Sequence, residues 1–170
     1  MKQQTKRLTR AGIIAALYVV LIFPVVSFAS GEIQIRPSEA LCVLCVFFPE
    51  ASVAMGVGCL VANIITGCTL IDIITGPIIT FAAGVITYFM CNKIQKPWLK
   101  YLLAGIPTVL LNAFLLPVVW YFATGLSHLY IICVLFLIAS ETLSVYALGA
   151  AFFFFIDKAR QKETGAELFK

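Results

Sequence analysis

Residues 101–140 read YLLAGIPTVLLNAFLLPVVWYFATGLSHLYIICVLFLIAS and contain no Asp, Glu, Lys or Arg. A membrane helix needs roughly 20 apolar residues to cross a hydrocarbon core about 30 Å thick, so this stretch is long enough to cross twice. The segment Ala123-Thr124-Gly125-Leu126-Ser127-His128 divides it, because Gly and small polar residues favour a turn. We therefore predict two membrane helices, over residues 98–122 and 129–156, with a polar turn between them.

The remaining sequence has the same apolar character. Of the 170 residues, 62% are apolar and 12% are charged, and the mean hydropathy is +1.03, whereas a soluble domain is about half apolar and a quarter charged. The uncharged runs do not alternate with polar residues, which disfavours the strands of a membrane barrel. Pro49 ends a shorter apolar run that begins at Ala40. The further predicted helices cover residues 8–28, 38–48, 50–66 and 70–92.

The predicted fold class is an all-α integral membrane protein, a single transmembrane domain over residues 1–170 that forms a six-helix bundle. Basic residues indicate its orientation, because Lys and Arg collect on the cytoplasmic side of a membrane. Only Arg36, of the 12 basic residues, falls on the opposite side in this map. We therefore expect short cytoplasmic tails at both ends, and a net charge of +4 that needs no nucleic-acid partner. A cleaved N-terminal signal is the weaker alternative.

Polar side chains within the apolar helices are the candidates for function, since an ionisable residue costs about 2.5–3.5 kcal/mol at the centre of a membrane helix. Glu141 is near the middle of the 129–156 helix, Asn112 is inside the 98–122 helix, and Asn63 is near the outer end of the 50–66 helix. Each could contact a ligand or could hydrogen-bond a neighbouring helix. Asp72 starts the 70–92 helix, where a carboxylate is either a ligand contact or an N-cap.

The segment GEIQIRPSEA at residues 31–40 concentrates polar side chains in the first external loop. In an extended loop the side chains of Gln34, Arg36 and Ser38 point the same way as that of Glu32. Gln34 and Arg36 could equally belong to a solvated loop, and Ser38 could cap the helix that follows. The loop is therefore a candidate wall for a binding site, and Glu39 is part of the same cluster.

Aromatic residues collect at the outer ends of the last two predicted helices: Trp120, Tyr121, His128 and Tyr130. Such residues usually form an interfacial belt, but they could also stack on a flat heterocycle. Cys42-x-x-Cys45 has a metal-type spacing, but His128 is the only histidine and there is no second Cys pair, so we expect no metal site. We also expect no catalytic residue and no cofactor, which leaves a membrane-embedded enzyme as the weakest functional alternative.

The sequence lacks the G-x-x-x-x-G-K-[ST] loop that binds nucleotide phosphates. Any transport against a gradient would therefore draw its energy from a partner or an ion. Small residues repeat one turn apart as Ala11-x-x-x-Ala15 and Gly12-x-x-x-Ala16 in the first helix. Such stripes let another helix approach closely, either within the bundle or from a partner.

Several segments of the sequence match one known family: Ala11-x-x-x-Ala15, the segment IQIRPSEAL at 33–41, the segment GCLVAN at 58–63, Asp72, Gly76, Glu141 and Gly149. Together they resemble the QueT family, the substrate-binding (S) components of energy-coupling factor (ECF) transporters for queuosine precursors. The resemblance covers nearly the whole chain and is most specific over residues 34–41, where Pro37 stands in place of an expected apolar residue.

The resemblance implies a six-helix bundle in the bacterial cell membrane that binds a 7-deazaguanine, such as 7-aminomethyl-7-deazaguanine or queuine, on its outer side. It implies docking through Ala11 and Ala15 on a transmembrane coupling subunit, driven by two ATP-binding subunits. An S component for thiamine, biotin or riboflavin is the alternative, because one fold serves many substrates. The substrate-binding residues that it implies are Gln34, Arg36, Glu39, Asn63, Asp72 and Glu141.

Overall fold

The structure is a computed structural model that describes residues 2–28, 35–124 and 130–168. These residues form helices and no strand. Two predicted candidates, Gln34 and His128, lie outside them. The elements are α1 (Lys2–Ile22), η1 (Phe23–Phe28), η2 (Pro37–Val46), α2 (Glu50–Ile65), α3 (Leu70–Cys91), α4 (Pro97–Ala104), α5 (Ile106–Thr124), α6 (Tyr130–Thr142), η3 (Leu143–Leu148) and α7 (Gly149–Leu168).

The predicted class of helical membrane protein is confirmed. By length and composition, four helical stretches are able to span a membrane: Gln3–Val26, Leu70–Cys91, Pro97–Phe122 and Tyr130–Lys162. The other two predicted spans correspond to shorter apolar helices, Pro37–Val46 and Glu50–Ile65. The count of six spanning helices is therefore not established by length alone.

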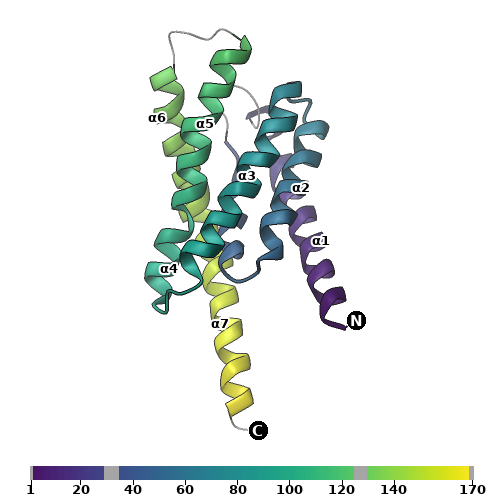
Figure 1. Cartoon of the computed structure of the whole chain (residues 1–170), viewed down its shortest axis with the longest axis vertical. Helices are drawn as coiled ribbons and strands as arrows, with labels where there is room; N and C mark the ends of the chain where they lie inside the picture. The colour runs from purple at the N-terminus through teal and green to yellow at the C-terminus, as the bar shows by residue number, and fades with distance from the viewer. Residues whose placement is uncertain (1, 29–34, 125–129, 169–170) are drawn as a thin grey trace.

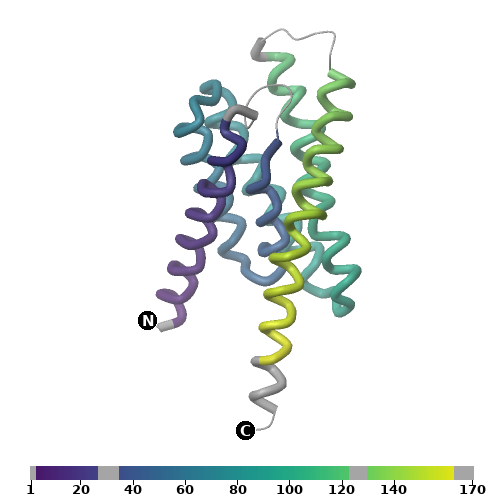
Figure 2. The backbone as a smooth tube through the Cα atoms, turned by 180° about the vertical axis from the view of Figure 1, so that it is seen from behind, coloured from purple at the N-terminus to yellow at the C-terminus, as the bar shows by residue number. Residues whose placement is uncertain are grey.

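The helices lie side by side in one elongated bundle (Figure 1). Both ends of the chain lie at the same end of it, which is also where α4 begins (Figures 1 and 2). Many large apolar side chains face outward, among them Ile78, Phe122 and Ile131, each more than half exposed. An outer surface of this kind is stable when it faces lipid tails. The end of the bundle that is lowest in Figure 1 contains the N-terminal segment, the 93–100 segment and the C-terminal segment, which are all rich in Lys and Arg.

The predicted helix 38–48 is a 3₁₀ helix at the centre of the bundle. A 3₁₀ helix rises about 2.0 Å per residue, so the ten residues of η2 reach further along the bundle than an α-helix of equal length. All residues from Ser38 to Val46 are buried, and η2 contacts α1, α3, α7 and η3. Ser38 does not cap it, because the N-cap residue is Arg36. Figure 2 shows η2 between α1 and the last helices, α6 and α7.

Two other predicted helices differ from their expected form. The 98–122 helix is interrupted at Gly105, between α4 and α5. The 129–156 helix contains a π-helical turn, η3, and continues beyond the predicted end at 156 to Leu168. Sequence periodicity gave no sign of either interruption, since both segments are apolar on all sides.

Candidate functional site

Four ionisable side chains are enclosed in the apolar bundle. Glu39, Asp72 and Glu141 belong to η2, α3 and α6, and Arg36 is the N-cap residue of η2. Their exposed fractions are 4% for Arg36, 0% for Glu39, 6% for Asp72 and 1% for Glu141. Charges at such depth are costly and usually have paired partners or a function. All four were predicted as substrate-binding residues, and the structure encloses each of them.

Arg36 is linked to Asp72 through Asn63. The Nη2 of Arg36 donates to Oδ1 of Asn63 at 3.1 Å, and Nδ2 of Asn63 donates to the backbone carbonyl of Asp72 at 2.8 Å. Arg36 is thus buried within the bundle, rather than part of a solvated loop. Gly76 makes room for this link, because a Cβ at that position would lie 2.8 Å from Nδ2 of Asn63.

Asp72 accepts hydrogen bonds on both carboxylate oxygens. Trp120 donates from Nε1 to Oδ1 at 2.6 Å, and Thr69 donates from Oγ1 to Oδ2 at 2.7 Å. The N-cap of α3 is Thr69, whose side chain accepts from the backbone N–H of Asp72. The alternative interpretation of Asp72 as the N-cap was therefore wrong, because Thr69, three residues earlier, caps α3. Asp72 instead accepts the hydrogen bonds of Thr69 and Trp120.

Glu39 and Glu141 approach one another around Asn112. Oε1 of Glu39 accepts from the hydroxyl of Tyr18 and from Thr80 Oγ1 at 3.4 Å. The charge of Arg36 acts on both carboxylates, and the Asn112 side chain lies next to both. Although these side chains are neighbours, three of their atoms make no hydrogen bond of normal geometry within the described part of the chain: Glu39 Oε2, Glu141 Oε2 and Asn112 Nδ2.

These three buried atoms give the cluster its chemistry. Leaving a buried donor or acceptor unpaired costs about 1–3 kcal/mol, and carboxylate oxygens are strong acceptors for paired N–H donors. The cluster can therefore bind a small polar molecule that offers N–H donors to the carboxylates and an acceptor to Asn112. No group of three or more His, Cys, Asp or Glu in the described residues is arranged to hold a metal ion, and Cys42 and Cys45 are buried free thiols.

Sequence analysis missed Tyr18 and Thr80 as partners of Glu39. Thr80 follows Asp72 and Gly76 at intervals of four residues, so helical periodicity places the three on one face of α3. Tyr18 follows Ala15 by three residues and lies on the same face of α1. Both positions could have been found by extending these stripes.

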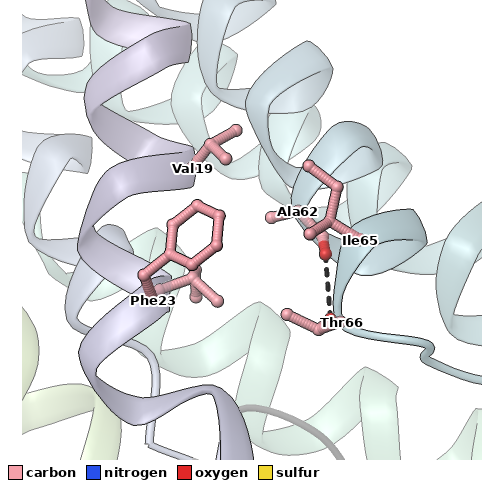
Figure 3. Close-up of a pocket in the computed structure, with 6 residues that line it drawn as sticks. Val19, Phe23, Ala62, Ile65 and Thr66 are labelled. Atoms are coloured by element: carbon pink, nitrogen blue, oxygen red, sulfur yellow. Dashed lines mark hydrogen bonds between the residues drawn. The ribbon is translucent and has the colours of Figure 1, made fainter.

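Arg36, Glu39, Asp72, Asn112 and Glu141 are called the polar cluster below. Two cavities described by the structure are lined by other residues. The first, between α1 and α2, is lined by apolar atoms of Val19, Phe23 and Ile65 and by Thr66, whose hydroxyl donates to Ala62 O at 2.8 Å (Figure 3). Its volume of about 10 Å³ is at most that of one water molecule. The second, about 210 Å³, is lined by Val118, Tyr121, Phe122 and Tyr130.

The second cavity contains two of the four aromatic residues proposed as a stacking wall, Tyr121 and Tyr130. Trp120 does not line it but is buried and bonded to Asp72. His128 lies outside the described residues. The aromatic set is therefore divided between this outer cavity and the polar cluster.

Comparison with known protein families shows which family the chain belongs to. A family model described as "QueT transporter" matches residues 8–158. The chain belongs to the QueT transporter family. It is accordingly a membrane transport protein rather than an enzyme, as the resemblance in its sequence predicted. No curated protein and no solved structure matches the chain.

The predicted docking residues of this QueT-family chain contact its own core. Ala11 and Ala15 are half-buried and pack against the main apolar cluster. A Cβ on Gly58 of α2 would lie 3.1 Å from the carbonyl of Ala15 and 2.7 Å from Cβ of Tyr18, so α2 packs closely on this face. The neighbouring stripe, Gly12 and Ala16, is exposed.

Gly76→Ala tests the link between Arg36 and Asp72. The added methyl group displaces Asn63 and leaves buried donors unpaired, so we expect about 1–3 kcal/mol of destabilisation, measured as a lower Tm in detergent. Gly12→Ala is the matched control, because nothing lies within 4 Å of a Cβ there and Ala is the better helix former. Equal Tm values for Gly76→Ala and the parent would contradict the packing of Asn63 against Gly76.

Proposed function

We propose that this chain is the S component of an ECF-type importer and captures a queuosine precursor, a 7-deazaguanine such as 7-aminomethyl-7-deazaguanine or queuine. The proposed binding residues are Gln34, Arg36, Glu39, Asn63, Asp72 and Glu141. The observation that carries the proposal is the set of buried unpaired atoms on Glu39, Glu141 and Asn112. Such atoms suit an importer subunit, because a bound substrate supplies hydrogen-bond partners for them.

The chemistry of a deazaguanine complements these atoms. Its Watson–Crick edge presents an amide N–H and an exocyclic amine, which one carboxylate can accept together, as carboxylates accept the paired donors of Arg. Glu141 and Glu39 are both suited to this role. An ammonium group at the 7-position would be stabilised by the second carboxylate, and stacking on an aromatic ring would add about 1–3 kcal/mol.

We place the chain in a bacterial cell membrane with six helices across the bilayer and both termini in the cytoplasm. In this orientation η2 and α2 cross as a pair of shorter helices, and the polar cluster is reached from outside. The position of both chain ends beside the basic 93–100 segment supports it (Figure 1). A substrate of the thiamine, biotin or riboflavin class remains the alternative.

Coupling to ATP hydrolysis would come from two ATP-binding subunits through a transmembrane coupling subunit. We propose that this subunit docks on the small-residue face of α1. Ala11 and Ala15, the predicted docking residues, lie on this helix and are half-buried against the protein's own core. The exposed Gly12 and Ala16 leave a shallow surface that another helix can approach closely.

Direct binding tests the substrate class. The purified chain is expected to bind 7-cyano-7-deazaguanine, 7-aminomethyl-7-deazaguanine or queuine more tightly than thiamine, biotin or riboflavin in calorimetric titrations. Glu141→Gln should weaken binding at least about tenfold, because the amide turns a donor toward the ligand's own donors. Glu50→Gln makes the same exchange at the other end of the bundle and should leave the Kd unchanged. If thiamine, biotin or riboflavin bound more tightly than the 7-deazaguanines, the proposed substrate would be wrong.

Docking is tested by comparing the two stripes of α1. Gly12→Leu with Ala16→Leu should prevent co-purification with the coupling subunit and leave ligand affinity nearly unchanged, because these side chains point away from the core. Ala11→Leu with Ala15→Leu should instead lower the Tm of the isolated chain, since both alanines pack against the apolar core. Normal complex formation by the Gly12 and Ala16 variant would exclude this face as the docking surface.

A further inference from the structure

Glu141 of α6 and Phe153 of α7 face the same neighbouring element, η2, along the helical stretch formed by α6, η3 and α7. In a regular α-helix the spacing of these two residues would place them on different faces. Successive residues of an α-helix are about 100° apart, so the two would differ by about 120°. Yet both are fully buried and face the η2 region: Phe153 packs on Phe47 at 5.0 Å between ring centres, and Glu141 interacts with Glu39.

The π turn η3 explains why Glu141 and Phe153 lie on the same face. A π turn closes its hydrogen bond over one residue more than an α turn, here from the N–H of Gly149 to the carbonyl of Ser144. The extra residue turns the helix back by about 100°, which leaves Glu141 and Phe153 only about 20° apart. The same correction brings Gly149 against η2, where a Cβ would lie 3.1 Å from the carbonyl of Ala40.

The junction between α4 and α5 holds this turn. The hydroxyl of Tyr101 donates to the carbonyl of Tyr146 at 2.5 Å, and the hydroxyl of Tyr146 donates to the carbonyl of Leu102 at 2.6 Å. Gly105 permits the contact, because a Cβ there would lie 2.5 Å from Val145 and 2.7 Å from the Tyr146 ring. Side chains of this kind compensate for the altered backbone hydrogen bonds of an irregular membrane helix.

We propose that Tyr101 and Tyr146 are positioning residues for Glu141: they hold the π turn and so set the direction in which the Glu141 carboxylate meets the ligand. The role rests on the proposed function of the polar cluster. The role is indirect, since among the described contacts neither tyrosine is a partner of Glu39 or Glu141. The α4–α5 junction therefore determines ligand affinity without contacting the ligand.

A double-mutant cycle tests the proposal. Tyr101→Phe is made in the parent and in Glu141→Gln, and the Kd for 7-aminomethyl-7-deazaguanine is measured by calorimetry with the Tm of each variant as a fold control. We expect Tyr101→Phe to raise Kd about fivefold in the parent and less than about twofold in Glu141→Gln, because its effect passes through that carboxylate. Tyr146→Phe should behave alike, and Tyr88→Phe, which removes a hydroxyl from α3, should not change Kd.

The outcomes separate the two proposals. Equal losses of affinity in both backgrounds, or no loss in the parent, would overturn the positioning role. If Glu141→Gln binds too weakly to measure, Glu141→Asp replaces it in the cycle. If the parent binds no 7-deazaguanine, the substrate assignment fails by itself, and the cycle is measured with the vitamin that does bind.

Discussion

Three carboxylates and one guanidinium group have to be accommodated inside an apolar bundle, and much of the structure follows from this. Each such charge is costly in a membrane unless it is hydrogen-bonded. Asp72 is satisfied by Trp120 and Thr69, and Arg36 is bonded to Asn63. Glu39 and Glu141 each keep one oxygen without a protein partner. The cluster is therefore satisfied within the protein at one end, and at the other it keeps buried acceptor atoms that a ligand can pair.

The backbone around the cluster is adapted to bring these side chains together. η2 is extended as a 3₁₀ helix and buried on all sides, which lets Arg36 and Glu39 enter the centre of the bundle from one short segment. Gly58 and Gly76 bring α1 and Asn63 into close contact with their neighbours. The π turn η3 places the buried residues of α6 and α7 on the same face. Each irregular element therefore serves the arrangement of polar side chains inside the bundle.

Sequence reasoning predicted the membrane class, the family and the polar residues, because charges and amides are conspicuous in an apolar chain. It could not predict the 3₁₀ form of η2 or the π turn, since these depend on which neighbours supply hydrogen bonds. It left open whether Arg36 belongs to a binding site or to a solvated loop, because the sequence does not show that Asn63 provides a buried partner for it. Ala15 is half-buried because Gly58 lets α2 pack closely on it, and the spacing of small residues within α1 cannot show this.

The most direct measurement is a structure of the chain with a bound 7-deazaguanine. The account predicts ligand density within hydrogen-bond distance of Glu39 Oε2 and Glu141 Oε2, with the side chain of Asn112 beside the ring. Density in the outer cavity between Tyr121 and Tyr130, with both carboxylates as they are now, would contradict the assignment of the polar cluster as the binding site.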